Sequence, residues 1–308
     1  MKVIVTGGAG FIGSHIVDAF IERAHQVFVI DNLSTGDRRH LNRKAEFYAM
    51  DILEPTLPEL FVRISPDVVC HHAAQMDVRR SVTDPVFDAR VNVLGLIQVL
   101  EASRISSVKK VLFASSGGAI YGEQEIFPAP EGHPTRPMSP YGVSKLAGEF
   151  YLAYYHRAFG MPYVALRYSN VYGPRQSASG EAGVVAIFLR HLVQGQPPTI
   201  NGDGLQTRDY VYVEDVAGAN ILAAEAPFSG ALNIGTARET DVCTLFSLLK
   251  QKAKSGISAV HGPAKPGEQR RSSIDPSQAR AVWRWEPRVF LEEGLERTIQ
   301  YYHEQTFA

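Results

Sequence analysis

The sequence predicts an α/β protein, built on a doubly wound parallel sheet and completed by a smaller mixed α/β lobe toward the C-terminus. Two observations carry this prediction. Strand-like and helix-like segments alternate through the first half of the chain, which is the pattern of parallel strands joined by right-handed helical crossovers. Beyond residue 170, glycine and proline gather in several stretches and the regular elements become shorter, as in a second lobe packed over the strand ends.

The expected strands and helices follow in order along the chain. The strands are 2–6, 27–31, 47–51, 67–74, 109–116 and 162–170, and the helices are 11–24, about 86–104 and 141–159. Segment 67–74 is a nearly continuous apolar run, as in a strand buried on both faces. Ser139 is a suitable N-cap and Pro140 a suitable first residue for the third helix. In the second lobe we expect strands 209–213 and 231–235 and an amphipathic terminal helix at 294–304.

Composition and charge place the chain among ordinary globular proteins. Of its 308 residues, 45% are hydrophobic and 20% are charged, and the formal net charge is −1. Electrostatics therefore gives no reason to expect a nucleic acid or an anionic membrane as a partner. No apolar run approaches the roughly 20 residues of a membrane span, and the chain enters a strand at once, so no signal peptide is expected. Cys70 and Cys243 belong to no CxxC pair, which suits a reducing, cytoplasmic setting.

A glycine-rich turn lies between the first strand and the first helix. Gly8, Gly10 and Gly13 match G-x-G-x-x-G in VTGGAGFIGSH, residues 5–15, and Gly7 extends the pattern. Glycines here permit a tight turn and a close approach of the backbone to a pyrophosphate, and the helix N-terminus supplies free N–H donors. Because the required strand–turn–helix context is present, we expect a Rossmann dinucleotide-binding site.

The end of the second strand indicates which dinucleotide binds. Asp31 lies eighteen residues beyond the last glycine of the motif, where a carboxylate accepts hydrogen bonds from the adenosine ribose. A carboxylate there also repels a 2′-phosphate, so NAD is favoured over NADP, although Arg38 and Arg39 lie nearby. Asp51, beside Ile52 after the third strand, is a candidate for contact with the adenine.

Further motifs recur, in this order, in one enzyme family. They are TGGAGFIG (6–13), HHAAQ (71–75), VNVLG (91–95), SSGGAIYG (115–122), YGVSK (141–145), LRYSNVYGPRQ (166–176), RDYVYVEDVA (208–217) and PGEQRRSSID (266–275). The set resembles the extended branch of the short-chain dehydrogenase/reductase superfamily, which includes nucleotide-sugar epimerases and dehydratases, and is most similar to the UDP-glucose 4-epimerases. The resemblance implies an NAD-binding Rossmann domain at 1–175, with a later return near 208–230, and a lobe at 176–308 that mainly binds the nucleotide sugar.

The resemblance also implies a reaction and its catalytic residues. Tyr141 and Lys145 form the family's Y-x-x-x-K motif and lie four apart on one helix face. Free tyrosine has a pKa near 10, and the Lys145 cation together with the positive nicotinamide ring should lower this pKa. Tyr141 would then take the proton of the sugar 4-hydroxyl while NAD takes the C4 hydride, and Lys145 would hold the nicotinamide ribose. A transient 4-keto sugar would interconvert UDP-glucose and UDP-galactose.

One position departs from the family pattern. Four residues before Tyr121, the epimerases usually carry Ser or Thr, which relays the proton of the sugar 4-hydroxyl to the tyrosine. This chain has Gly117 there, followed by Gly118. Either Ser116 reaches the same oxygen, because the glycines let the backbone bend closer to the sugar, or Tyr141 acts alone. Ser116 is therefore a third catalytic candidate and a substrate contact.

The remaining candidate binding residues come from the same resemblance. For the cofactor they are Phe11 and Ile12 at the pyrophosphate, Asn32, Ser34, Thr35 and Gly36 in the adenosine loop, Ala73, Ala74 and Gln75 along the cofactor channel, Asn92, and Tyr168 near the nicotinamide. For the nucleotide sugar they are Asn170, Arg208 and Arg271 at the diphosphate and Ser272 near the sugar. Arg270 is a rival of Arg271. The small Ser272 would also admit N-acetylated UDP-hexosamines.

Alternative functions differ in identifiable residues. The 4,6-dehydratases resemble one another in an Asp–Glu pair before Tyr121, and UDP-glucuronate decarboxylases carry a Glu there, whereas this chain has no carboxylate from Gly117 until Glu123. Elimination then lacks its proton donor. A UDP-glucuronate 4-epimerase stays open, with Arg175 and Arg190 as candidates to meet a uronate. A non-catalytic NAD-bound regulator is a further alternative, though such proteins often lose the tyrosine or the lysine.

We expect no metal site and one protein partner. His71 and His72 are adjacent in a strand and would point to opposite faces, so they would not share a metal. Helices 86–104 and 141–159 both carry apolar residues on more than one face, and such helices need a partner besides the sheet. We therefore expect a homodimer joined by a four-helix bundle, with a UDP-sugar as the small-molecule partner.

Overall fold

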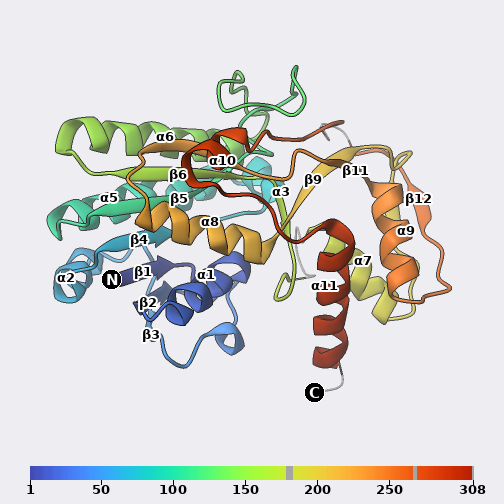
Figure 1. Ribbon diagram of the computed structural model, residues 1–308, viewed down its shortest axis with the longest axis horizontal. Helices are drawn as coiled ribbons and strands as arrows, with labels where there is room; N and C mark the ends of the chain where they lie inside the picture. Colours follow the sequence, from blue (N-terminus) through green and yellow to red (C-terminus); the bar gives the residue numbers. More distant parts are fainter. Residues whose placement is uncertain (178–182, 266–268, 307–308) are drawn as a thin grey trace.

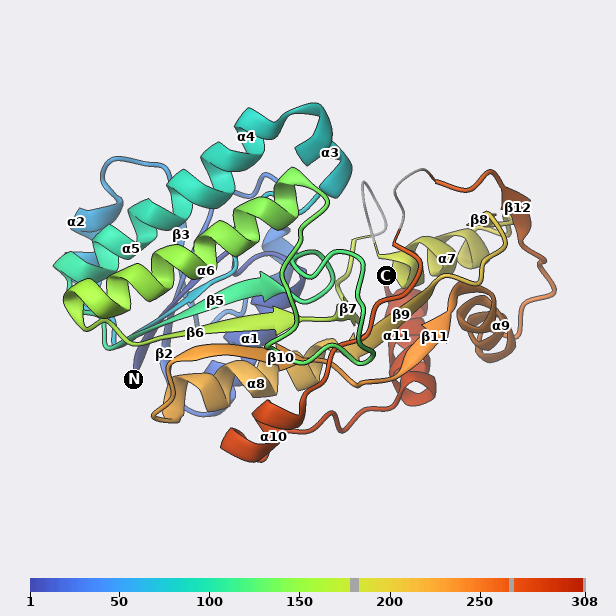
Figure 2. The same ribbon diagram turned by 90° about the horizontal axis from the view of Figure 1, so that it is seen from above.

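The computed structural model describes residues 1–177, 183–265 and 269–306, and these contain the expected doubly wound sheet. Seven parallel strands lie in the order β10-β6-β5-β4-β1-β2-β3 (Figure 1, with β10 labelled in Figure 2). They are β1 (Lys2–Thr6), β2 (Gln26–Asp31), β3 (Glu46–Ala49), β4 (Val68–His71), β5 (Lys110–Ser116), β6 (Tyr163–Tyr168) and β10 (Gly230–Ile234). The strand order reverses between β1 and β4, and sheets of this kind bind ligands at the strand ends beside such a reversal.

Helices cover both faces of this sheet (Figures 1 and 2). One face carries α1 (Phe11–Glu22) and α8 (Val213–Glu225), and the other carries α2 (Leu57–Ile64), α5 (Gly95–Ile105) and α6 (Pro140–Phe159). The side chains of β1 alternate between two buried clusters, with Val3 and Val5 on the α1 side and Ile4 on the α5 side. Burial on both faces explains why the strands are continuous apolar runs.

The segment predicted as one helix over 86–104 is divided. α3 (Val78–Thr83) and α4 (Pro85–Ala89) precede a π-helical turn, η2 (Arg90–Leu94), which continues as α5. α4 has its own start, because the Asp84 carboxylate accepts a hydrogen bond from the Phe87 N–H at 3.0 Å and Pro85 takes the first helical position. The π-helical turn contains Asn92, which is buried.

α6 begins and ends as the sequence predicts. The Ser139 hydroxyl accepts a hydrogen bond from the Gly142 N–H at 3.2 Å, and Pro140 is the first helical residue. The helix ends at Gly160, whose φ of +66° is the left-handed conformation that commonly terminates helices. Tyr141 and Lys145 therefore lie in the first two turns, at the end of α6 that faces the carboxyl ends of the strands.

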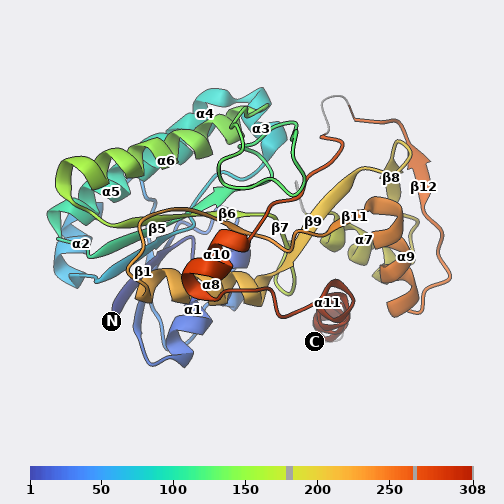
Figure 3. The same cartoon turned by 45° about the horizontal axis from the view of Figure 1, so that its top comes forward.

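A smaller lobe lies beside those strand ends (Figures 2 and 3). It has a three-stranded sheet in the order β11-β9-β7 and a parallel pair of β12 with β8. Its elements are β7 (Asn170–Tyr172), α7 (Val184–Val193), β8 (Thr199–Asn201), β9 (Thr207–Tyr212), β11 (Glu239–Asp241), α9 (Val242–Lys252), β12 (Val260–Gly262) and α11 (Leu291–Thr306). A separate apolar cluster, which includes Phe188, Leu245 and Phe246, forms its core.

Two elements return to the first lobe after the second has begun. α8 covers one face of the large sheet, and β10 pairs with β6 at the sheet edge, where α10 (Ser277–Trp283) packs against β10.

The first three residues of the PGEQRRSSID motif lie outside the described residues. In the described part of the chain, no helix combines the length and the apolar character needed to cross a membrane.

Candidate active site

The glycine turn has the geometry of a pyrophosphate cradle. Gly7 adopts a left-handed φ of +69°. A Cβ on Gly13 would lie 2.1 Å from the Gly7 carbonyl oxygen, so only glycine lets α1 start this close to β1. α1 begins at Phe11 with Gly10 as its N-cap and no side-chain cap. An uncapped N-terminus presents its first N–H groups, those of Phe11 and Ile12 among them, to an anion. These residues fit a dinucleotide.

Asp31 ends β2 with its carboxylate turned back onto the glycine turn. Its Oδ2 accepts a hydrogen bond from the Ala9 N–H at 3.0 Å, and its Oδ1 accepts one from the Leu33 N–H at 2.8 Å. Gly36 packs against the same group, since a Cβ there would lie 2.9 Å from Oδ1. Each carboxylate oxygen keeps a further acceptor position, so Asp31 could still receive ribose hydroxyls.

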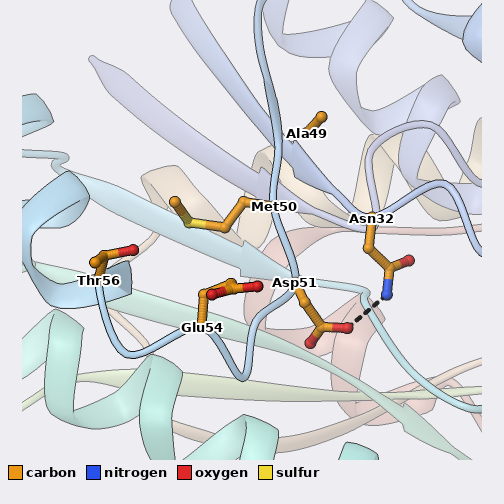
Figure 4. A pocket seen from close by; sticks show the side chains of 6 residues that line it. All are labelled: Asn32, Ala49, Met50, Asp51, Glu54 and Thr56. Atoms are coloured by element: carbon orange, nitrogen blue, oxygen red, sulfur yellow. Dashed lines mark hydrogen bonds between the residues drawn. The ribbon is translucent and has the colours of Figure 1, made fainter.

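A surface pocket of about 330 Å³ opens beside this loop. It is lined by Asn32, Ala49, Met50, Asp51, Glu54 and Thr56 (Figure 4). Asn32 Nδ2 donates to Asp51 Oδ2 at 2.7 Å, which joins two predicted cofactor residues from the ends of β2 and β3. Ser34 and Thr35 are exposed in the loop after β2, whereas Ile52 is buried. The pocket could hold an adenine and its ribose.

The two arginines of the ribose loop are engaged by neighbouring side chains. Arg39, in the short helix η1 (Arg38–His40), forms an ion pair with Asp37 at 2.6 Å. The Arg38 guanidinium lies 5.3 Å from the centre of the Phe47 ring. Neither contact draws an arginine toward the Asp31 carboxylate, which agrees with NAD as the cofactor.

The ends of β4 and η2 meet in a buried polar network. Asn92 Nδ2 donates to the Gln75 carbonyl, and Asn92 Oδ1 accepts from the Gln75 N–H, both at 2.9 Å. Asp88 in α4 accepts from Gln75 Nε2 at 3.0 Å, from Asn92 Nδ2 at 2.9 Å and from the Ser144 hydroxyl at 2.6 Å. The sequence analysis missed Asp88 and Ser144. Only the spacing of Asp88 from Asn92, four residues on one helical segment, could have indicated a link.

The three predicted catalytic residues lie together where β5 ends and α6 begins. The Ser116 side chain is hydrogen-bonded to the Tyr141 phenol. Lys145 Nζ donates to the Ala114 carbonyl at 2.9 Å and lies 5.7 Å from the centre of the Tyr141 ring. A phenol, a hydroxyl and a buried cation in this arrangement can exchange a proton with a substrate hydroxyl.

The pKa of Tyr141 differs from the expectation. Burial and, to a smaller extent, the Asp88 charge raise it to about 12, and the hydrogen bond with Ser116 opposes this rise. Burial also lowers the pKa of Lys145 to about 8, while Asp88 opposes that change. The sequence analysis expected the pKa of Tyr141 to be lowered, whereas the buried phenol has a raised pKa and is neutral near pH 7. The contribution expected from the nicotinamide ring stays a prediction.

Gly117 lies against a residue from the end of the chain, Ile274. A Cβ at this position would lie 2.7 Å from Ile274 Cδ1 and 3.3 Å from the Tyr168 carbonyl oxygen. Ile274 is buried and packs with Ile120 and Tyr121 of the loop that follows β5. A Ser or Thr at position 117 would have to push the end of the buried Ile274 side chain aside, which disfavours the hydroxyl of the family pattern there. Ser116 is the neighbouring residue that bonds to Tyr141.

Tyr168 and the two histidines point into the protein. The Tyr168 hydroxyl accepts a hydrogen bond from Asn220 Nδ2 at 2.8 Å and lies 3.0 Å from His72 Nε2. His71 Nδ1 lies 2.8 Å from the Thr6 hydroxyl. Ala73 and Ala74 follow β4, and the Ala73 backbone abuts the glycine turn, because a Cβ on Gly7 would lie 2.6 Å from the Ala73 nitrogen. The Tyr168 side chain thus lies in the core beneath the predicted nicotinamide site.

The predicted nucleotide-sugar residues come from several segments of the second lobe. Asn170 is exposed at the start of β7, and Ser272 is buried. Arg208, in β9, donates to the Thr207 carbonyl at 2.7 Å. Arg271 makes a two-point ion pair with Glu239, at 2.6 Å and 2.9 Å, and stacks 3.8 Å from the centre of the Phe127 ring.

Arg270, the rival candidate, has a different partner. It forms a two-point ion pair with Asp203, at 2.8 Å and 2.9 Å. Arg271 is the arginine that touches the loop after β5, through Phe127, and that loop also begins at Ser116. This contact favours Arg271 over Arg270 as the residue nearer the catalytic group.

Comparison with known proteins gives one family. Residues 3–235 match the model of the NAD dependent epimerase/dehydratase family. A UDP-glucose 4-epimerase from Mycolicibacterium smegmatis is 40% identical, covering 99% of this chain and 100% of its own length.

Two solved structures are similar throughout. The UDP-glucose 4-epimerase of Thermotoga maritima, determined with UDP-glucose, has a TM-score of 0.98 and 47% identity, covering 99% of this chain and 100% of its own. The UDP-glucose 4-epimerase of Thermus thermophilus, determined with NAD, has a TM-score of 0.94 and 42% identity, covering 98% of this chain and 99% of its own.

Proposed function

The chain belongs to the NAD dependent epimerase/dehydratase family, and from this premise we propose that it is a UDP-glucose 4-epimerase that interconverts UDP-glucose and UDP-galactose. One observation carries the proposal beyond family membership. Tyr141, Ser116 and Lys145 converge at the end of β5, next to a glycine turn that fits a dinucleotide. We assign residues 1–175, with the later return to the sheet, to NAD binding and residues 176–308 mainly to the nucleotide sugar.

The residues take the following parts in the reaction. When bound, NAD supplies reversible acceptance of the C4 hydride and a positive charge that favours the Tyr141 phenolate. Tyr141 removes the proton of the sugar 4-hydroxyl, directly or through the Ser116 hydroxyl, as the C4–H bond breaks. The 4-keto sugar turns over, and Tyr141 returns the proton when the hydride returns to the other face. Lys145 holds the ribose, and the reaction involves no net oxidation.

The second lobe would bind the nucleotide diphosphate. Arg208 and Arg271 are fixed cations with planar, forked donors that match phosphate oxygens. Arg271 already forms a two-point ion pair with the Glu239 carboxylate, and a diphosphate would compete for the same donors. Asn170 and Ser272 complete the proposed site on the sugar side.

Two competing reactions receive less support. Glu123, the first carboxylate after Gly117, is exposed, so the segment between Gly117 and Glu123 offers no buried acid for a 4,6-dehydration. Arg175, a candidate for a uronate, is paired with Asp18 at 2.7 Å. A UDP-glucuronate 4-epimerase is therefore the second candidate, and N-acetylated UDP-hexosamines are further candidate substrates because Ser272 is small.

One coupled assay tests the function. The purified protein with NAD is incubated with UDP-glucose, UDP-N-acetylglucosamine or UDP-glucuronate, and the products are separated by anion-exchange chromatography. We expect UDP-galactose from UDP-glucose, with no lasting rise of the reduced-nicotinamide absorbance. Accumulating reduced nicotinamide would identify a dehydrogenase instead, and turnover of UDP-glucuronate alone would identify the second candidate.

Replacing Ser116 with alanine should lower kcat by about tenfold or more, because a positioned proton relay is worth on the order of 10- to 1000-fold. The control is NAD affinity measured by calorimetry, which should stay unchanged because Ser116 contacts Tyr141 rather than the glycine turn. A loss of kcat below about threefold would mean that Ser116 only supports the backbone and that Tyr141 works alone.

We also propose that the protein is a cytoplasmic homodimer. Val143, Phe150 and Tyr154 form an exposed apolar stripe along α6 and are 54%, 68% and 50% exposed. Leu94 and Ile105, at the two ends of the neighbouring helical segment, are 56% and 52% exposed. Both cysteines are free, as suits a reducing compartment. Two such helix pairs, one from each subunit, would bury these side chains in a four-helix bundle.

Phe150→Glu should convert the dimer into a monomer, because it places a charge in the middle of the apolar stripe. Sedimentation velocity at micromolar concentration measures this change. Val260→Glu is the matched control, since Val260 is also half exposed but lies on β12 in the other lobe, and it should sediment as the wild type does. A wild-type protein that sediments as a monomer would contradict the proposal.

A further inference from the structure

Asp88 has a fully buried carboxylate that is hydrogen-bonded to Ser144, the residue of α6 that precedes Lys145. Its exposed fraction is 0%. Both carboxylate oxygens accept hydrogen bonds, Oδ1 from the amide groups of Gln75 and Asn92 and Oδ2 from the Ser144 hydroxyl. None of these three donors is a cation. A buried carboxylate that is hydrogen-bonded only to neutral donors is costly, so its position calls for a functional reason.

The surroundings of Lys145 identify that reason. Tyr141 lies on the same helix as Lys145, with the centre of its ring 5.7 Å from Lys145 Nζ. The titratable groups of other elements that interact with Lys145 are His71 and His72 from β4 and Asp88 from α4. Burial and the Lys145 charge hold the pKa of each histidine at about 3, so both histidines are neutral. Tyr141 is a neutral phenol. Asp88 is therefore the acidic side chain whose charge raises the pKa of Lys145.

We propose that Asp88 is the fixed counter-charge of the site, a positioning residue that keeps Lys145 cationic and keeps Tyr141 protonated until ligands are bound. Ser144 links Oδ2 of the carboxylate to α6 next to Lys145, and Gln75 and Asn92 hold Oδ1. The network therefore holds the Asp88 carboxylate in a fixed position relative to α6, the helix that carries Tyr141 and Lys145. Its charge favours the protonated form of both Tyr141 and Lys145, in agreement with the direction of its effect on each pKa.

Asp88→Asn removes the charge and keeps the shape. The asparagine oxygen can accept from Gln75 and Asn92 as before, and the Ser144 hydroxyl can rotate to accept from the new amide. Ser144→Ala is the matched control, because it deletes one hydrogen bond of the same network and leaves the charge. The two variants thus separate an electrostatic role from a structural one.

The test is the pH dependence of NAD affinity, measured by calorimetry on protein freed of cofactor, together with the pH profile of turnover. In the wild type we expect affinity to fall as the pH rises through about 8, where Lys145 loses its proton. In Asp88→Asn both the midpoint for NAD affinity and the two limbs of the turnover profile should move to lower pH by about 0.5–1 unit. Ser144→Ala should keep the wild-type midpoints.

Only the turnover arm rests on the proposed function, because NAD binding requires no knowledge of the sugar substrate. A wild type that binds NAD but turns over no UDP-sugar would overturn the proposed function, and the midpoints for NAD affinity would still test Asp88. Unmoved midpoints in Asp88→Asn, at whatever activity, would overturn the role of Asp88, as would equal shifts in Ser144→Ala. If Asp88→Asn does not fold, Asp88→Ser removes the same charge and is judged by the same midpoints.

Discussion

Replacing Tyr141 with phenylalanine is expected to lower turnover by roughly 100-fold or more, since it removes the general base, while the protein still binds NAD. Phenylalanine keeps the ring that packs beside Lys145, so only the phenol oxygen and its hydrogen bond with Ser116 are lost. The variant is compared with the wild type by initial rates of UDP-galactose formation and by calorimetric titration with NAD.

Lys145→Ala provides the contrast. Lys145 is buried and donates to the Ala114 carbonyl, and in the proposed reaction it also holds the ribose. Its loss should therefore reduce turnover and NAD affinity together, whereas Tyr141→Phe reduces turnover alone. Normal turnover of Tyr141→Phe would mean that another group takes the substrate proton, and the proposed mechanism would be wrong.

The parts of the site that could be predicted from the sequence are those specified by local spacing. Gly7 and Gly13 fall in a short motif whose steric reason is local, and the close contact between them is the one such a motif requires. Tyr141 and Lys145 lie four residues apart on α6, which itself begins at a recognisable Ser139–Pro140 cap. The large sheet could be predicted equally well, from the alternation of strand-like and helix-like segments along the first half of the chain.

The parts that could not be predicted depend on contacts between distant segments. Gly117 is explained by Ile274, which lies far away in the sequence and reaches the loop after β5 only once the lobes have assembled. The predicted continuous helix over 86–104 is interrupted by a π-helical turn that buries Asn92 beside Asp88. Apolar periodicity alone carries no sign of such a turn.

The pKa of Tyr141 is the clearest case. Sequence spacing indicates that Lys145 is near the phenol, but it gives no measure of burial or of the Asp88 charge on another helix. Both oppose ionisation of the phenol in the protein without ligands. Since a pKa is set by desolvation and by all nearby charges together, a two-residue motif cannot give its direction.

A buried ion pair anchors the helix that carries these catalytic residues. Glu149, two turns beyond Tyr141 on α6, accepts hydrogen bonds from the Arg167 guanidinium of β6, with a shortest N–O distance of 2.6 Å. The two side chains are only 10% and 9% exposed. Ser115 donates to Glu149 at 2.5 Å, and Arg167 also donates to the Tyr121 hydroxyl at 2.9 Å. The pair therefore joins α6 to β5, β6 and the loop after β5.

Glu149→Ala is expected to lower the free energy of unfolding by about 3–5 kcal/mol, because it leaves the Arg167 cation buried without its partner. Urea denaturation followed by circular dichroism measures the change. Arg39→Ala is the matched control: Arg39 pairs with Asp37 at the same 2.6 Å but is 80% exposed, so its removal should leave the unfolding midpoint almost unchanged. The double change Glu149→Leu with Arg167→Met should recover much of the loss, since apolar side chains of similar volume remove both buried charges. If Glu149→Ala and Arg39→Ala unfold at the same urea concentration, the buried pair is not what holds α6 against the sheet.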